Sequence, residues 1–346
     1  MVFDSNSQSK TILVIGATGA QGSAVIDKLL EAPEKYKIRA LTRDASSAGA
    51  KVLQARGVEL YEGSFVDLKA VERALQGVYG VFVNTDGSSY SEATEIHVGI
   101  RIFELSKWAG VRHYVYSSID NVYKLGGYNP ENKSDHCDAK ARVAEWMSAQ
   151  PSSVDGMVWS VLVTLPYMEG LNLCFLGPIK REDGTVVFRL PLGDTGAIPY
   201  ITLEDLAFYA RYIFDNPDKT SGEILEPVSD IVTGAQLAGT LTNVTGKPAS
   251  YEAVSFEKWA EHCGLDMTGP MAAVEKKRGD GSVTAGEDFA GFWKAYRDGL
   301  VKKDFELNKK INPGSLNLEA WMRKNNYVGD VERKSIRAGL GAETKG

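Results

Sequence analysis

Short apolar segments alternate with amphipathic ones through the first half of the chain. The apolar segments are nearly continuous, and they predict strands at residues 11–16, 37–42, 58–61, 79–85, 113–118 and 157–165. The segments between them carry apolar residues at helical spacing, and they predict helices at residues 21–32, 44–56, 67–76, 91–110 and 138–150. Apolar strands that alternate with helices are typical of a parallel sheet covered on both faces. An α/β domain is therefore expected.

The pattern is less regular after Pro166. Strands are predicted at residues 185–190, 197–202 and 222–228, and helices at residues 202–216, 233–246, 255–263, 289–305 and 318–326. Residues 275–288 are polar and lack periodicity, which predicts a loop. We expect a larger domain over residues 1–165 and a tail over residues 331–346. Between them, residues 166–330 are expected to form a smaller α/β lobe for a substrate or a partner, interleaved with the larger domain.

Three glycines follow the first predicted strand at regular spacing. The stretch VIGATGAQGSAVIDKLL, residues 14–30, places Gly16, Gly19 and Gly22 between that strand and the first helix. There the first glycine permits a tight turn, the second lets the backbone approach a pyrophosphate, and the third lets the helix pack close to the strand. The alternative is that the glycines serve only the turn. We interpret residues 1–165 as a Rossmann-type NAD(P)-binding domain with a doubly wound parallel sheet.

The end of the second predicted strand indicates which dinucleotide is bound. NAD-binding domains place an acidic residue here for the ribose 2′-hydroxyl, whereas this chain has Thr42 followed by Arg43. A guanidinium group matches a 2′-phosphate with two charge-assisted hydrogen bonds, and the alternative is an ordinary surface arginine. Asp44 lies one position later and is predicted to cap the next helix. NADP(H) is therefore expected in preference to NAD(H).

Further candidate residues follow the third, fourth and fifth predicted strands. Ligands in open α/β sheets lie beyond the carboxyl ends of the strands. The candidate cofactor contacts at these ends are Ser64, Phe65, Asn84, Thr85, Ser117 and Ser118. Each of them is equally typical of an ordinary strand end.

A second candidate group lies in the stretch SDHCDAKARVAEWM, residues 134–147. His136 and Lys140 are four residues apart and share one face of a helix. Short-chain dehydrogenases use a tyrosine and a lysine at this interval, the tyrosine to donate a proton and the lysine to hold the nicotinamide ribose. Here histidine stands in place of the tyrosine. Lys140 is expected to contact the ribose, and His136 either transfers a proton or only positions its neighbours. With Ser118 they are the candidate catalytic residues.

Composition narrows the class of protein. The formal net charge of −6 argues against a general nucleic-acid surface, which needs clustered lysine and arginine. The apolar runs are too short to predict a membrane span, and the N-terminus has no features of a signal peptide. Cys137, Cys174 and Cys263 occur singly without metal-ligand spacing, so we expect reduced thiols and no metal site. The expected location is the cytoplasm, with the nucleus as the alternative.

Five stretches together resemble the NmrA-like family, an atypical branch of the short-chain dehydrogenases and reductases: GATGAQG, LTRD, YVYSS, HCDAK and LPYMEGLN. The resemblance covers roughly residues 10–265, and the C-terminal remainder is similar to that of larger fungal members. Ser64 departs from an acidic residue often present there, which puts one adenine contact in doubt. The resemblance implies that the pyrophosphate is held by Gly16, Thr18, Gly19, Gln21 and Gly22, the 2′-phosphate by Arg43, and the nicotinamide by Lys140, Pro166 and Tyr167.

The family includes both enzymes and regulators, so the resemblance leaves the activity open. The first hypothesis is an NADPH-dependent reductase of a small carbonyl, enone, imine or quinone, and the residues beyond bare nucleotide binding favour it. Under this hypothesis the candidate walls of an apolar pocket are Tyr167, Phe175 and Trp293. The candidates for a displaced proton donor are Tyr123, Tyr128 or Tyr167. The alternative role of each of these aromatic residues is packing in the core or at its rim. The alternative is a non-catalytic NADP(H) redox sensor or transcriptional co-regulator that acts through protein partners. A third hypothesis is a protein that keeps the nucleotide for stability alone.

Overall fold

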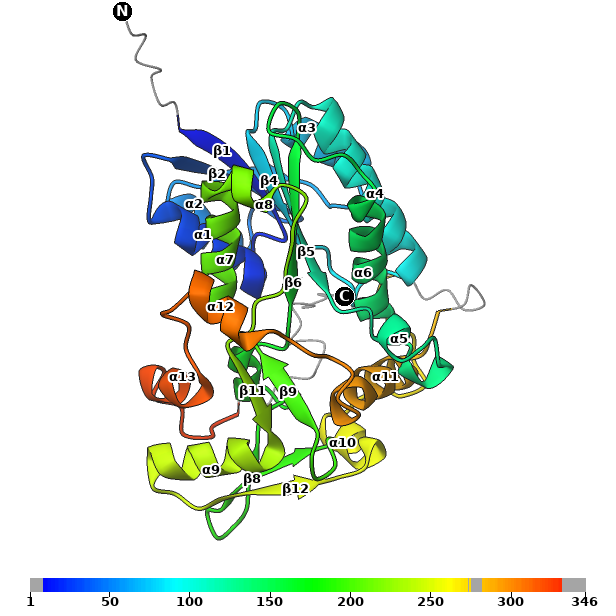
Figure 1. Ribbon diagram of the computed structural model, residues 1–346, viewed down its shortest axis with the longest axis vertical. Helices are drawn as coiled ribbons and strands as arrows, with labels where there is room; N and C mark the ends of the chain where they lie inside the picture. Colours follow the sequence, from blue (N-terminus) through cyan, green and yellow to red (C-terminus); the bar gives the residue numbers. More distant parts are fainter. Residues whose placement is uncertain (1–8, 273, 275–281, 332–346) are drawn as a thin grey trace, which may run out of the picture.

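A seven-stranded parallel sheet forms the centre of the protein, which is described by a computed structural model over residues 9–272, 274 and 282–331 (Figure 1). The strand order is β10-β6-β5-β4-β1-β2-β3, and every neighbouring pair is parallel. The strands are β1 (Lys10–Ile15), β2 (Tyr36–Thr42), β3 (Glu59–Glu62), β4 (Gly80–Val83), β5 (His113–Ile119), β6 (Val158–Thr164) and β10 (Ile224–Leu225). The chain runs outward from β1 to β3 and then returns to the other side of β1. The predicted doubly wound α/β fold is confirmed, with its switch point between β1 and β4.

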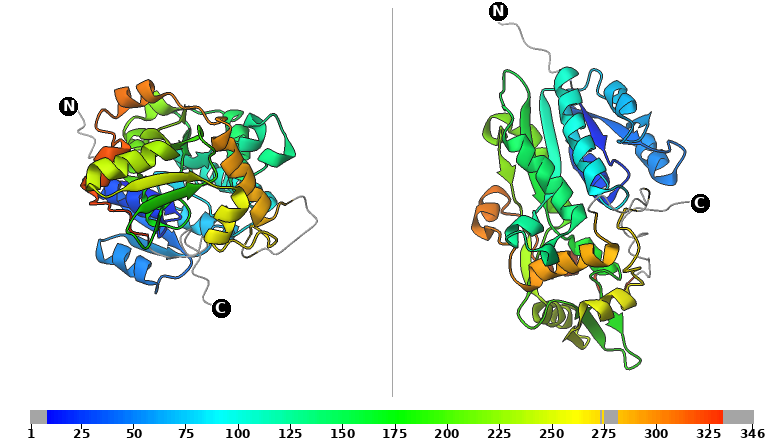
Figure 2. Two further views of the ribbon diagram at one scale, coloured as in Figure 1. Left: turned by 90° about the horizontal axis from the view of Figure 1, so that it is seen from below. Right: turned by 90° about the vertical axis from the view of Figure 1, so that its right-hand side faces the viewer.

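Helices cover both faces of this sheet (Figures 1 and 2). One face packs against α1 (Ala20–Leu30), α2 (Ala48–Ala55) and α7 (Leu203–Asp215), and the other against α3 (Leu68–Ala74), α4 (Glu92–Trp108) and α6 (Asp135–Ser148). Alternate residues of β1 serve the two layers, because Ile12 and Val14 face the first and Leu13 and Ile15 face the second. All four side chains are fully buried, as the nearly continuous apolar pattern predicts for a strand between two helical layers.

The second half of the chain forms a separate core below the carboxyl edge of the sheet. Its strands are β7 (Ile179–Lys180), β8 (Val186–Leu190), β9 (Ala197–Tyr200), β11 (Asp230–Thr233) and β12 (Ala249–Ala253). Its helical segments are η2 (Met168–Asn172), α9 (Gly234–Thr245), α10 (Phe256–His262), α11 (Ala285–Arg297) and α13 (Leu318–Lys324). Two short segments from the first half of the chain pack beside it, α5 (Val122–Leu125) and η1 (Pro130–Asn132). Both α7 and β10 return from this half to the main sheet, and α7 packs beside α1. The division at residue 165 stays a prediction.

Two expectations for residues 275–305 are wrong. Residues 275–281 lie outside the described residues, but the last part of the predicted loop is helical, because Thr284 and Glu287 form a capping box that starts α11 at Ala285. The helix predicted over residues 289–305 ends at Arg297, shortly before Gly299, which has a φ of +66°. A separate helix, α12 (Phe305–Ile311), follows. The tail predicted from residue 331 lies outside the described residues after its first residue.

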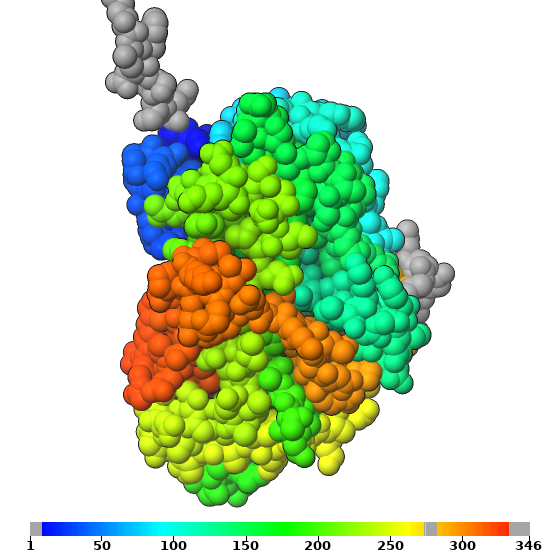
Figure 3. Space-filling view, viewed as in Figure 1, coloured from blue at the N-terminus to red at the C-terminus, as the bar shows by residue number. Residues whose placement is uncertain are grey.

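The segment between α11 and α12 crosses the molecule between its upper and lower parts, where it is drawn in orange (Figures 1 and 3). Lys303 in this segment has a fully buried side chain, and its ammonium lies 2.7 Å from an Asp120 carboxylate oxygen. Asp120 directly follows β5. This ion pair fixes the C-terminal third of the chain against the carboxyl edge of the sheet, where ligands bind in folds of this type.

Candidate functional site

The glycine turn after β1 leaves no room for side chains at its first and third glycine. Gly16 has a φ of +81°, and a Cβ on it would lie 2.6 Å from the backbone oxygen of Asn84. A Cβ on Gly22 would lie 2.2 Å from the backbone oxygen of Gly16. Around Gly19 the described residues leave space, since the single atom near a Cβ there is the Gly16 oxygen at 3.3 Å. The backbone is therefore shaped for a ligand that approaches Gly19 closely.

The start of α1 suits an anion. Gly19 is the N-cap residue, no described side chain caps the helix, and the first turn contains no acidic residue. The N–H groups of that turn therefore keep the positive end of the helix dipole unopposed. Thr18 is exposed beside this turn. These features fit the pyrophosphate of a dinucleotide.

The Gln21 side chain connects the glycine turn to two distant elements. Ser117 on β5 donates a hydrogen bond to Gln21 Oε1 at 2.7 Å, and Gln21 Nε2 donates to the Tyr167 hydroxyl. Pro166 precedes Tyr167, and its carbonyl accepts a hydrogen bond from Ile201 N. Burial raises the pKa of Tyr167, so its hydroxyl stays protonated at neutral pH. The structure thus brings Gln21, Ser117 and Tyr167 together.

The corner after β2 presents Arg43 to solvent. Among the described residues, none forms a hydrogen bond or an ion pair with its side chain. Thr42 is buried, and its hydroxyl bonds to the backbone of Asp44. The Asp44 carboxylate accepts hydrogen bonds from the backbone and side chain of Ser46, and Ser47 is the residue that caps α2. The prediction that Asp44 caps this helix is therefore wrong, because the turn that it stabilises separates it from the helix.

The ends of β3 and β4 hold the next predicted contacts. Ser64 accepts a hydrogen bond from Val66 N at 3.4 Å, and the half-buried Phe65 ring meets the Tyr90 ring edge to face at 5.3 Å. Asn84 donates its backbone N–H to Ile15 at the end of β1, which keeps β4 next to the glycine turn. The predicted cofactor contacts of these side chains stay predictions.

Lys140 is held by a buried acidic partner. Its ammonium donates hydrogen bonds to the Thr85 carbonyl oxygen at 2.6 Å, to the Thr85 hydroxyl at 2.7 Å and to Glu95 Oε1 at 2.7 Å. The Thr85 hydroxyl in turn donates to Glu95 at 2.6 Å, and the Glu95 side chain is 1% exposed. An ammonium group has three donors, so these protein groups engage all of them. The Lys140–Glu95–Thr85 cluster joins α6, α4 and the end of β4.

His136 is held by a second buried carboxylate. Asp288 of α11 accepts a hydrogen bond from His136 N at 3.1 Å and pairs with His136 Nδ1 at 2.5 Å. Nε2 lies 3.3 Å from the Cys137 sulfur, and the rings of Phe289 and Phe292 flank the imidazole. Burial opposes the imidazolium, but Asp288 and the Cys137 thiol outweigh it and raise the pKa of His136 well above its ordinary value. The histidine thus connects α6 to α11.

The remaining candidate residues contact other protein groups. Ser118 is buried, and its hydroxyl donates to the backbone oxygen of Ile119. Trp293 is 1% exposed and packs against Phe175 in the core of the second half, so it is no wall of an open pocket. Tyr123 and Tyr128 form an edge-to-face pair at and after α5.

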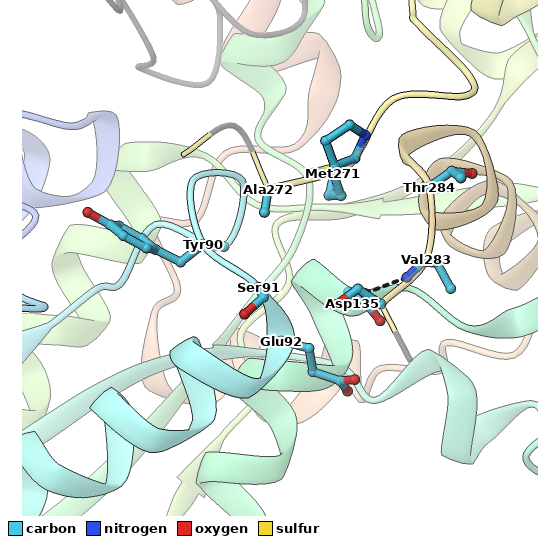
Figure 4. Close-up of a pocket in the computed structure, with 11 residues that line it drawn as sticks. Tyr90, Ser91, Glu92, Asp135, Met271, Ala272, Val283 and Thr284 are labelled. Carbon is cyan, nitrogen blue, oxygen red and sulfur yellow. Dashed lines mark hydrogen bonds between the residues drawn. The ribbon is translucent and has the colours of Figure 1, made fainter. Parts of the chain in front are cut away.

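A cavity of about 140 Å³ lies beside the start of α4 and α6 (Figure 4). A Cβ on Gly87 in its wall would lie 2.8 Å from Glu95 Oε2 and 3.3 Å from the His136 Cβ, so the cavity adjoins both buried pairs. Asp135 on one side accepts a hydrogen bond from Val283 N at 2.9 Å on the other. The described lining residues are Gly87, Tyr90, Ser91, Glu92, Asp135, Pro270, Met271, Ala272, Ser282, Val283 and Thr284.

Glu95 and Asp288, the carboxylates that hold Lys140 and His136 of α6, were not among the residues predicted for the site. Glu95 lies three residues before the buried Val98 on the inner face of α4, so its helical spacing was an available indication of burial. Asp288 lay within a predicted loop, and the Thr284 and Glu287 capping pattern could have moved it into a helix. No spacing in the sequence indicates that Asp288 meets His136. No helix in the described part of the chain is long and apolar enough to cross a membrane.

Comparisons with known proteins agree with the resemblance. The sequence profile described as the NmrA-like family matches residues 8–298. The NmrA-like family domain-containing oxidoreductase himF of Aspergillus japonicus is 31% identical over 255 residues, covering 70% of this chain and 76% of the relative. The NAD(P)H azoreductase of Xenophilus azovorans is 30% identical over 249 residues, covering 71% and 78%. The solved structure of NmrA, a negative transcriptional regulator, in complex with NADP shares the fold with a TM-score of 0.69 at 19% identity, covering 92% of this chain and 95% of NmrA. The chain belongs to the NmrA-like family.

Proposed function

We propose that the protein is an NADP(H)-dependent reductase that acts on a small carbonyl, enone, imine or quinone. The observation that carries this proposal is the exposed Arg43 beside the uncapped start of α1, a pair of features suited to the 2′-phosphate and the pyrophosphate of one dinucleotide. Two relatives at 30% identity or more are named an oxidoreductase and an NAD(P)H azoreductase, which supports the reaction class.

The preference for NADP(H) over NAD(H) rests on residues of this chain. NmrA has been solved with NADP and also with NAD, so relatedness alone gives no preference. Arg43 has no partner among the described residues, and no acidic side chain occupies the position of Thr42. A charged group that is not already paired adds its full attraction to a 2′-phosphate.

The residues of α6 favour substrates that need little help with proton transfer. The nicotinamide, when bound, supplies the hydride. Lys140 has all three donors engaged, and both ring nitrogens of His136 contact protein groups, so each is placed to orient the site. Hydride addition to a quinone or an iminium ion gives a product that is stable or that takes its proton from water. We therefore favour these two substrate classes over simple ketones.

The second candidate function is a non-catalytic NADP(H) sensor that acts through a protein partner. The same complete engagement of Lys140 and His136 favours it, because neither residue is free to donate to a substrate. The structural relative NmrA is described as a negative transcriptional regulator. The third hypothesis, nucleotide binding for stability alone, has no observation in its favour.

Loss of NADPH absorbance, measured with a panel of quinones, iminium ions, enones and aldehydes, tests the proposal. Calorimetry on the same preparation measures NADPH and NADH affinity. Arg43→Ala is expected to weaken NADPH binding by about 10- to 100-fold, since one charge-assisted contact is worth roughly 1.5–3 kcal/mol, and to leave NADH binding unchanged. Arg56→Ala, which removes a surface pair with Asp27, is the matched control.

The outcomes separate the two functions. Turnover with any class of acceptor supports the reductase and names its substrate. Firm NADPH binding without turnover across the panel supports the sensor. A partner protein that binds this protein with only one redox state of the dinucleotide bound would then establish the sensor function. Equal loss of NADPH and NADH binding in Arg43→Ala would contradict the assigned 2′-phosphate contact. The cytoplasm or the nucleus stays the proposed location, since none of the three cysteines, all of them in the described part of the chain, forms a disulfide.

A further inference from the structure

We propose that Cys174 and Cys263 form a dithiol site that a peroxide oxidises to an intramolecular disulfide. Cys174 lies in the loop after η2, and Cys263 ends α10, 89 residues later. The Cys263 thiol lies 3.2 Å from the backbone oxygen of Cys174, to which it donates. The fold thus places the Cys263 sulfur against the backbone of Cys174, so the two cysteines are neighbours in space.

Neighbouring contacts hold the two cysteines in place. Trp259 of α10 donates its indole N–H to the backbone oxygen of Phe175 at 3.1 Å, and the two rings lie 5.5 Å apart. Both cysteines belong to the core of the second half of the chain. Because this packing has already fixed the loop against α10, closing the disulfide costs little further conformational entropy.

The two thiols differ in reactivity. Cys174 is half-buried, and the neighbouring Cys263 thiol lowers the pKa of Cys174 to about 7, so a large share of it is thiolate at neutral pH. Cys263 is 5% exposed, and the neighbouring Cys174 and burial raise the pKa of Cys263. Cys174 is therefore the attacking group and Cys263 the resolving one. Cys137 is fully buried, and burial raises its pKa, so it serves as an unreactive internal reference.

The chemistry balances in two steps with hydrogen peroxide as oxidant. The Cys174 thiolate attacks one peroxide oxygen, the O–O bond breaks, and the departing hydroxide leaves Cys174 as a sulfenic acid. The Cys263 sulfur then attacks the Cys174 sulfur, the S–S bond forms, and the S–O bond breaks. The hydroxide that leaves takes up the Cys263 proton as water. The two sulfur atoms give up two electrons in total. The first hydroxide takes up the proton that Cys174 released when it ionised, so the peroxide is reduced to two molecules of water.

The site lies close to the candidate functional residues. The Phe175 ring, next to Cys174, contacts the rings of Phe289 and Phe292, and both of these flank His136. A disulfide at Cys174 therefore forms one layer of rings away from the His136–Asp288 pair. The proposed modification itself does not depend on the reductase function, and it is measured without any assay of activity.

The test uses the purified, reduced full chain, treated with hydrogen peroxide and then digested without reductant. The expected result is a peptide pair joined through Cys174 and Cys263, an intact mass lower by two hydrogens, and a fall from three free thiols to one. Cys174→Ser and Cys263→Ser are expected to abolish this pair, whereas Cys137→Ser retains it. The rate is expected to rise with pH through the Cys174 pKa of about 7.

A disulfide that includes Cys137, a disulfide between two chains, or three intact thiols at a peroxide dose that fully oxidises glutathione would overturn the proposal. Sulfinic acid on Cys174 without a disulfide would also overturn it, because the resolving step would have failed. Circular dichroism checks that the serine variants fold. If one of them does not, the peptide map of the unmodified chain and of Cys137→Ser decides the question.

Discussion

Replacing Asp288 by asparagine removes the charge that holds His136 protonated and leaves the side-chain shape nearly unchanged. Asp288 is fully buried, and its two oxygens contact the backbone and the ring of His136. Breaking a buried ion pair from one side costs roughly 3–5 kcal/mol. His136 can lose its proton in the variant and so avoid the upper end of that range. We therefore expect Asp288→Asn to lower the free energy of unfolding by about 3 kcal/mol at a pH below about 6.5.

The pH dependence gives the prediction its sign. The pKa of His136 is raised in the folded protein, so the pair contributes its full stability below the ordinary histidine pKa of about 6.5. That contribution is lost as the pH rises through the higher pKa of the folded state. The difference between the parent protein and Asp288→Asn is therefore largest in mild acid and becomes smaller in alkali. The neighbouring Asp138 has a pKa raised to about 6, chiefly by burial and partly by the Asp288 charge, so Asp288→Asn also lowers the pKa of Asp138.

Urea unfolding followed by tryptophan fluorescence at several pH values measures this difference. Asp298→Asn, at the C-cap of the same helix, is the matched control. Asp298 pairs with Lys294 and Arg297 in a partly exposed position, so we expect a loss below about 1 kcal/mol. A loss for Asp288→Asn that is the same at acid and alkaline pH, or no larger than that of the control, would refute the charge-pair reasoning.

Two further predictions concern the glycine turn and the Lys140 cluster. Gly22→Ala is expected to weaken dinucleotide binding in calorimetry by more than about tenfold, since its Cβ would collide with the Gly16 backbone oxygen and displace α1. Gly239→Ala, in open space on α9, is its control and should gain roughly 0.5–1 kcal/mol of stability, and equal binding by both variants would contradict the packing argument. Glu95→Gln is expected to cost roughly 3–5 kcal/mol in urea unfolding, because it leaves the Lys140 ammonium without its buried partner. Glu104→Gln on the same helix loses a partly exposed pair with Arg101, and it should lower the free energy of unfolding by less than about 1 kcal/mol. Similar losses for the two variants would contradict the argument that the buried Lys140–Glu95 pair contributes more than a surface pair.

Local patterns were sufficient for the main sheet and its glycine turn. Most of its first six strands contain a short apolar run, and Gly16, Gly19 and Gly22 occur at a spacing that few other turns require. The strand pattern and the glycine spacing each depend on residues that are close together in the chain. They can therefore be recognised from the sequence alone. The short strands β7 and β12 were missed because neither has an apolar pattern of its own, and pairing with β8 makes them strands.

Contacts between distant residues decided the chemistry of the site. The sequence by itself determined that His136 and Lys140 share a face of one helix, because helical spacing requires it. Only the tertiary structure showed that Glu95 and Asp288 neutralise them, one from α4 and the other from a helix 152 residues beyond His136. The same holds for Gln21, whose side chain turns away from the glycine loop to Ser117 and Tyr167. A residue's identity fixes what it can donate or accept, but its partner depends on packing between elements that no local pattern encodes.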